Sequence, residues 1–199
     1  MPDQQKKWNE RYRQSEAEAG PGGAALILTQ NAYLLPDSGV ALDLACGLGA
    51  NALFMAQRGL QVVAWDVSQV AIEKLQHAAV RHQLPLQAQV RDVTEEPPEA
   101  NRFDVIVITH FLERQLVAGL VDALKAGGLI FYQTFTKEKV SDKGPGNPDY
   151  RLGRNELLNL FTQSSFPPLR ILLYREEGLV GDISQGFRNE AMLVAQKSN

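Results

Sequence analysis

The chain is poor in the residues that mark secreted, membrane-bound or metal-binding proteins. Its single cysteine, Cys46, cannot form a disulfide within the chain, which fits a reducing compartment and leads us to expect a cytoplasmic protein. No apolar run approaches the roughly 18 residues of a membrane helix, and the first residues lack the apolar core of a secretory signal, so we expect no membrane association. No metal site is predicted, because the three histidines are not spaced as a ligand set: His77, His82 and His110.

Charge of one sign is also scarce. The 199 residues carry 20 lysines and arginines against 23 aspartates and glutamates, a formal net charge of -3, and no dense basic block appears. Nucleic-acid binding usually needs a basic face, so the composition argues against a nucleic-acid partner. The length suits one α/β domain with a full core, and we expect a single domain over residues 1–199.

Strand-like and helix-like segments alternate after residue 40, which predicts parallel strands joined by crossover helices. The expected strands cover residues 40–45, 61–65, 86–90, 103–108 and 129–135, with a closing pair at 169–174 and 191–195. The expected helices cover 50–58, 69–82 (with Ser68 as its N-cap), 116–124 and 156–161. A turn is expected at Gly127-Gly128, and a long polar connection, 136–154, follows the fifth strand.

Residues 1–35 are expected to form a helical segment that precedes a core over 36–199, with one helix over 3–15 and another over 24–35. Trp8 and Tyr12 are four residues apart and therefore share one helix face. Two interpretations remain open: the two rings form a lid over a bound cofactor or substrate, or they pack against the core.

Ligands of an open parallel sheet bind beyond the carboxyl ends of its strands, where the strand order reverses. There the first strand delivers a glycine-rich loop, the second Asp66, the third Asp92, and the fourth Thr109 and His110. The spacing Gly47-x-Gly49-x-x-Ala52 also suits the loop of a nicotinamide-dinucleotide site. Two acids argue against that ligand: one inside the first strand and one at the end of the third.

The segment Asp43-Leu44-Ala45-Cys46-Gly47-Leu48-Gly49 resembles the first motif of class I S-adenosylmethionine-dependent methyltransferases, with Ala45 in place of the first glycine. The resemblance extends over 40–135. It implies a Rossmann-like α/β fold: a seven-stranded, mostly parallel sheet with an antiparallel C-terminal strand and helices on both faces. Two further segments resemble the tellurite-resistance and thiopurine-type small-molecule branch, namely WNERY at 8–12 and GPGNPDYRLGRNELLNLF at 144–161.

The resemblance implies S-adenosylmethionine as cofactor and a role for each loop residue. The backbone from Ala45 through Cys46 and Gly47 to Gly49 would lie along the methionine part, and Asp43 would anchor that loop or receive the ammonium. Asp66 would accept the ribose hydroxyls. The remaining expected contacts are the adenine neighbours Val67, Asp92 and Val93, together with Asn51 and Thr109.

Plainer interpretations stand beside these roles. Asp43 can cap a turn, Asn51 or Asp66 can cap a helix, and Asp92 can be an ordinary loop acid. His110 is a candidate general base, with a hydrogen-bonded loop histidine as the alternative. We expect a small-molecule methyl acceptor; the alternatives are methylation of protein or RNA, and a nicotinamide-binding protein without methyltransferase activity.

Overall fold

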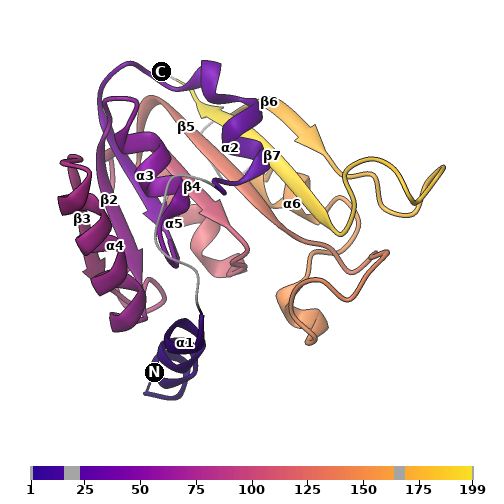
Figure 1. Ribbon diagram of the computed structural model, residues 1–199. Coiled ribbons are helices and arrows are strands. Elements are labelled where there is room, and N and C mark those ends of the chain that lie inside the picture. Colours follow the sequence, from indigo (N-terminus) through magenta and orange to yellow (C-terminus); the bar gives the residue numbers. More distant parts are fainter. Residues whose placement is uncertain (1, 16–22, 164–168, 199) are drawn as a thin grey trace.

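A computed structural model describes residues 2–15, 23–163 and 169–198 of the chain (Figure 1). Its strands form one sheet in the order β3-β2-β1-β4-β5-β7-β6. They are β1 Val40–Leu44, β2 Gln61–Asp66, β3 Leu86–Val90, β4 Phe103–Thr109, β5 Leu124–Phe135, β6 Leu169–Arg175 and β7 Glu190–Lys197.

Strands β1 to β5 pair in parallel, whereas β7 runs antiparallel to both of its neighbours, β5 and β6. The predicted seven-stranded, mostly parallel sheet with an antiparallel C-terminal strand is therefore confirmed. The strand order reverses between β1 and β4, where Asp43 pairs with Val107 and Leu44 with Ile108. Ligands of open α/β sheets bind at such a switch point, which directs attention to the carboxyl ends of these two strands.

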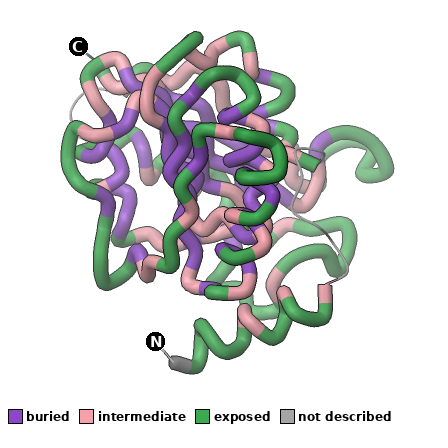
Figure 2. The backbone as a smooth tube through the Cα atoms, turned by 60° about the vertical axis from the view of Figure 1, so that its left-hand side comes forward, coloured by how far each residue is buried: buried purple, intermediate pink, exposed green. Residues whose placement is uncertain are grey.

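Alternate strand residues point to opposite faces of the sheet, and on the central strands both sets are apolar. Helices therefore cover both faces. Leu42 and Ile106 belong to the core that packs under α5 and α6, and Ala41 and Val105 to the core under α2, α3 and α4. Figure 2 shows the buried centre inside exposed turns. The helices are α1 Pro2–Gln14, α2 Leu26–Gln30, α3 Ala50–Ala56, α4 Gln69–Arg81, α5 Val117–Ala123 and α6 Glu156–Phe161.

Three local expectations differ from the structure. The helix expected over 24–35 is two short pieces, α2 and a 3₁₀ turn at Ala32–Leu34, separated at Asn31, whose side chain donates 2.8 Å to the Ile27 carbonyl. The helix expected over 116–124 begins as a 3₁₀ turn at Arg114–Leu116. The Gly127-Gly128 pair lies inside β5, where the pairing with β4 shifts register.

The predicted N-cap of α4 is confirmed. Ser68 has an extended backbone, and its hydroxyl accepts a hydrogen bond of 3.2 Å from the Ala71 N–H. This cap begins α4 two residues after Asp66, so the helix leads directly away from the carboxyl end of β2.

Candidate functional site

The loop after β1 turns back sharply over the carboxyl edge of the sheet. Ala45, Gly47 and Gly49 all have positive φ angles, 55°, 52° and 75°. Gly49 also permits a close approach, because a Cβ at this position would lie 2.3 Å from the Leu75 side chain of α4. Two of these positions carry the glycines expected from the sequence pattern, and the third carries a strained alanine.

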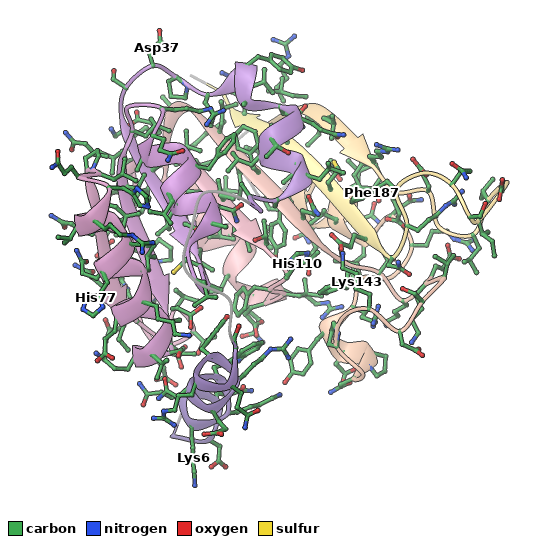
Figure 3. The ribbon with its side chains drawn as sticks, viewed as in Figure 1. Lys6, Asp37, His77, His110, Lys143 and Phe187 are labelled. Atoms are coloured by element: carbon green, nitrogen blue, oxygen red, sulfur yellow. The ribbon has the colours of Figure 1, made fainter. Side chains whose placement is uncertain are left out.

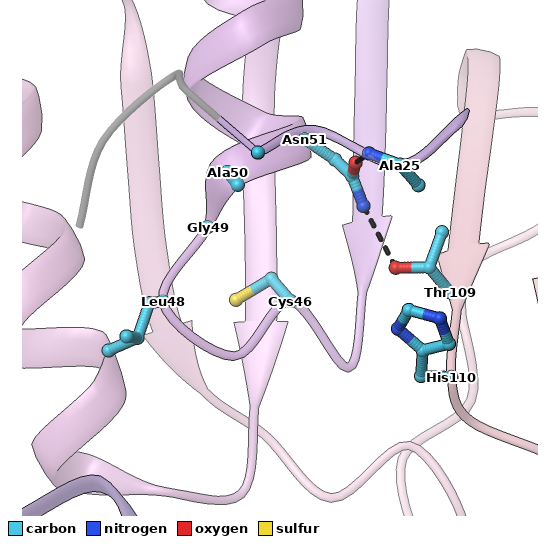
Figure 4. Close-up of a pocket in the computed structure, with 9 residues that line it drawn as sticks. Ala25, Cys46, Leu48, Gly49, Ala50, Asn51, Thr109 and His110 are labelled. Atoms are coloured by element: carbon cyan, nitrogen blue, oxygen red, sulfur yellow. Dashed lines mark hydrogen bonds between the residues drawn. The ribbon is translucent and has the colours of Figure 1, made fainter. Parts of the chain in front are cut away.

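A pocket opens between this loop and the end of β4 (Figure 4). Its volume is about 180 Å³. Four predicted cofactor-binding residues line it, and so does the candidate base: Cys46, Gly49, Asn51, Thr109 and His110. Burial raises the pKa of the Cys46 thiol, so this residue lines the pocket as a neutral thiol and is no activated nucleophile.

Asn51 joins three segments of the pocket wall. Its side-chain Nδ2 donates to the Thr109 hydroxyl at 2.9 Å, and its Oδ1 accepts from the Ala25 N–H at 2.8 Å. Figure 4 shows the Asn51–Thr109 bond crossing from the start of α3 to the end of β4. The helix-capping interpretation of Asn51 is wrong, because Asn51 lies in the first turn of α3 and the N-cap position belongs to Gly49.

Asp43 lies behind the loop and is fully buried. Its Oδ2 accepts the Ala52 N–H at 2.9 Å, while Oδ1 has no hydrogen-bond partner in the part of the chain that the structure describes. Burial raises the pKa of Asp43 to about 7, and the bond from Ala52 offsets only part of that effect. Asp43 thus anchors the start of α3 and keeps one acceptor oxygen unused.

Asp66, at the end of β2, also holds the loop in place. Its Oδ2 accepts the Gly47 N–H at 2.9 Å, and its Oδ1 accepts the Ser68 N–H at 2.8 Å. Burial raises the pKa of Asp66, although these backbone bonds partly counter the effect. A carboxylate has about four lone-pair positions, so both oxygens retain the capacity to accept ribose hydroxyls.

The third acid lies further along the same edge. Asp92 Oδ1 accepts from both the backbone N–H and the hydroxyl of Thr94, at 2.9 and 2.6 Å. Val93 is buried in the core, and Val67 is half-buried beside Asp66. None of these three residues lines the pocket beside β4, so their expected place around an adenine stays a prediction.

The N-terminal helix α1 covers the β1–β2 side of this edge, and Figure 1 shows it apart from the sheet at that end. The Tyr12 hydroxyl lies 2.7 Å from the point that a Cβ on Gly47 would occupy. Asn9 accepts from the Ser68 hydroxyl at 2.7 Å, and Lys74 of α4 donates to the Tyr12 carbonyl at 2.9 Å. Trp8 stacks on Tyr12 at 5.8 Å rather than entering the core.

On the other side of the pocket, His110 contacts residues that sequence reasoning missed. Its Nε2 lies 3.2 Å from Glu190 Oε2, and Glu190 also accepts from Gln133 and Lys143. A signal for Glu190 existed: it is a single acid at the start of an apolar C-terminal strand, and an antiparallel strand begins where its parallel neighbours end.

The part of the chain that the structure describes contains neither a metal-ligand cluster nor a membrane-spanning helix. Within residues 2–15, 23–163 and 169–198, no group of three or more histidine, cysteine or acidic side chains could hold a metal ion. No helix in these ranges is long and apolar enough to cross a membrane.

Comparison with known proteins finds similarity to methyltransferases. Residues 41–128 match a family model described as a methyltransferase domain. The chain is 28% identical over 101 residues to a ubiquinone biosynthesis O-methyltransferase of Coxiella burnetii, covering 48% of this chain and 43% of that protein. It is 26% identical over 150 residues to the cypemycin N-terminal methyltransferase of a Streptomyces species, covering 69% and 60%. The match therefore spans less than half of the first relative's length.

The fold agrees with these matches. The crystal structure of TehB from Haemophilus influenzae aligns with a TM-score of 0.70 and 20% identity, over 98% of this chain and 67% of TehB. The glycine-rich loop, the ordered acids and the reversed strand order already described lie within the matched region. Residues 41–128 match the methyltransferase-domain model, and the chain shares its fold with S-adenosylmethionine-dependent methyltransferases of known structure.

Proposed function

We propose that the protein transfers a methyl group from S-adenosylmethionine to a small-molecule acceptor. One observation carries this proposal: the loop from Ala45 to Gly49 bounds a pocket at the switch point between β1 and β4, and two buried carboxylates support it. A sulfonium cofactor supplies an electrophilic methyl group, so the protein needs mainly to bind and orient the reactants.

The residues present suit this cofactor chemically. Asp43 anchors the loop from behind, with one oxygen that has no partner within the described residues, and Asp66 presents two acceptor oxygens for a diol. Asp92 Oδ2 makes no hydrogen bond within the described residues and can accept from an adenine amino group. We assign the methionine end to Cys46, Gly47 and Gly49, the ribose to Asp66, and the base to Val67, Asp92 and Val93.

The pocket has less volume than the roughly 300–1,000 Å³ typical of sites that enclose a whole small-molecule ligand. Next to this pocket, the Tyr12 hydroxyl of α1 lies over Gly47 and near Asp66, where the ribose would bind. The pocket beside Asn51 and Thr109 thus corresponds to the methyl-transfer end, and α1 must move for the nucleoside to bind.

The acceptor is proposed to be small because the chain has no excess of basic residues. The names of two relatives refer to ubiquinone biosynthesis and to the N-terminus of cypemycin. The second name favours one further candidate, the amino terminus of a peptide. The single cysteine supports a reducing compartment, and we place the reaction in the cytoplasm.

Titration calorimetry with S-adenosylmethionine and with NAD tests the proposed function. We expect binding of S-adenosylmethionine only, and Asp66→Asn should weaken it more than about tenfold, which corresponds to about 1.4 kcal/mol. Asp104→Asn is the matched control, because Asp104 also accepts a backbone N–H, that of Val40 at 2.7 Å, but at the opposite edge of the sheet. Binding of NAD without S-adenosylmethionine would contradict the proposal.

A further inference from the structure

Four side chains from separate segments converge beside the end of β4, and one of them, His110, lines the pocket. Glu190, at the start of β7, is 3% exposed. Its Oε2 contacts His110 Nε2 at 3.2 Å and accepts from Gln133 Nε2 at 2.6 Å, and its Oε1 accepts from Lys143 Nζ at 2.8 Å. Gln133 is fixed in turn, because its Oε1 accepts the Ile27 N–H at 2.8 Å. Figure 3 shows His110 and Lys143 close together near the middle of the molecule.

We propose that His110 removes the proton from the nucleophilic atom of the methyl acceptor, and that Glu190 positions the imidazole for this task. The acceptor is then a hydroxyl compound, or an amine that reaches the site protonated, because each must lose a proton before or as its lone pair attacks the methyl carbon. This inference rests on the proposed methyltransferase function and narrows the class of its acceptor.

The contacts of Glu190 determine which ring nitrogen is free. Burial would raise the pKa of Glu190, but the hydrogen bonds from His110, Lys143 and Gln133 outweigh it and lower the pKa to about 2. An ionised carboxylate can only accept hydrogen bonds, so the proton of a neutral His110 lies on Nε2. Nδ1 then carries the lone pair, and it makes no hydrogen bond within the described residues.

The position of His110 is held at a conformational cost. Its φ of 57° is left-handed, a conformation that only a few per cent of non-glycine residues adopt, and such backbone strain tends to occur at functional sites. The His110 N–H donates to the Gln133 carbonyl at 2.9 Å, and the ring stacks on Phe135 at 4.8 Å. The side chain still remains 43% exposed and lines the pocket.

Charged groups of both signs surround the His110 ring. The positive charge of Lys143 balances the negative charge of Glu190 while the imidazole is neutral. Once the imidazole has taken up a proton, Glu190 is its counter-ion. Arg151 lies on the far side, against Phe135, and Cys46 lines the same pocket as a neutral thiol. Within the described residues no other ionisable group contacts the ring, so His110 lies between one carboxylate and two nearby cations.

The reaction balances as follows. The acceptor lone pair forms the new bond to the methyl carbon, the electron pair of the broken carbon–sulfur bond stays on sulfur as a neutral thioether, and the acceptor proton moves to His110 Nδ1. A thiolate or another deprotonated nucleophile would need no such base.

Nitrogen NMR of ¹⁵N-histidine-labelled protein at pH 8.5 tests the positioning. We expect His110 to carry its proton on Nε2 alone, while exposed His77 and His82 show mixed tautomers. In Glu190→Met this preference should disappear, and in Lys143→Met it should persist because the contact with Glu190 remains. A proton on Nδ1 of wild-type His110 would overturn the proposal even if Glu190→Met failed to fold.

Release of S-adenosylhomocysteine from S-adenosylmethionine with catechol, butylamine or thiophenol tests the acceptor class. We expect turnover with catechol or butylamine, reduced at least about a hundredfold in His110→Asn, whose side chain tolerates the left-handed backbone. His77→Asn, on the outer face of α4, should keep full turnover. Turnover with thiophenol alone, unchanged in His110→Asn, would contradict the proposal.

Calorimetry separates this inference from the proposed function. If the wild-type protein does not bind S-adenosylmethionine, the proposed function and the general-base role of His110 are both wrong. If wild type and His110→Asn bind the cofactor equally while wild-type His110 holds its proton on Nδ1, only the general-base inference is wrong. The proposed methyltransferase function then stands.

Discussion

At the residue scale, Ala45 occupies a backbone position that favours glycine. Its φ of 55° costs an L-residue about 1 kcal/mol or more relative to glycine, and the sequence pattern places a glycine here in related loops. The side chain is nevertheless accommodated, because Ala45 packs against the core on the α5 side. The residue therefore stores local strain beside the proposed methionine site.

Ala45→Gly should raise the free energy of unfolding by up to about 1 kcal/mol, because relief of strain exceeds the extra freedom of glycine in the unfolded chain. Urea denaturation measures the change. Ala118→Gly, on the exposed side of α5, is the control and should lower stability by about 1 kcal/mol. Equal losses in both variants would show that the left-handed backbone carries no strain.

Asp43 makes folding stability depend on pH. Its pKa of about 7 lies above the ordinary value, so between about pH 4 and 7 the folded chain binds more protons than the unfolded chain. The contribution of this group is thus fully present at low pH and is lost as pH rises through that window. In Asp43→Asn this dependence should vanish.

The stability of wild type minus that of Asp43→Asn should therefore fall by about 2–3 kcal/mol between pH 5 and 8. Denaturation curves of both proteins at each pH supply the measurement, and the subtraction removes the titration of every other group. A difference that stays constant across this range would show that Asp43 is ionised throughout.

At the element scale, α1 behaves as a cover for the loop after β1. Asn9 and Tyr12 contact the start of α4 and Gly47, and Lys74 donates to the carbonyls of Tyr12 and Ser15 at the end of α1. A cation at a helix C-terminus stabilises it through the helix dipole. Neither the Trp8 nor the Tyr12 ring belongs to the two described core clusters, and a lid over a bound cofactor or substrate stays a prediction.

Lys74→Met should loosen α1 and increase both the association and the dissociation rate of S-adenosylmethionine, because the cover opens more often. Stopped-flow measurement of the fluorescence of Trp8, which stacks on Tyr12 in α1, follows both rates. Lys6→Met, on the exposed side of α1 (Figure 3), should leave them unchanged. Unaltered rates in Lys74→Met would show that α1 does not limit access.

At the scale of the whole molecule, charge separates the candidate acceptors. A formal net charge of -3 opposes the electrostatic attraction on which nucleic-acid binding depends. We expect no retention of the protein on double-stranded RNA at about 0.15 M salt, as a filter-binding assay would measure. Micromolar binding that weakens steeply with salt would instead favour an RNA methyltransferase.

Much of the fold follows from local patterns, and one part of the site does not. Asp66, Asp92, Thr109 and the glycine loop were predictable because each follows a recognisable parallel strand. Glu190 escapes this pattern because it lies at the start of an antiparallel strand, not at the carboxyl end of a parallel one. Its pairing with Phe135 brings the first residue of antiparallel β7 to that same edge.

The sequence by itself determined the order of the strands' motifs, the cap at Ser68 and the acids behind the loop, since these depend on backbone preference and hydrophobic period over a few residues. Only the tertiary structure decided that α1 covers Gly47 and that His110 meets Glu190, which lies 80 residues away. Such contacts depend on how distant segments pack, and no local pattern encodes that arrangement.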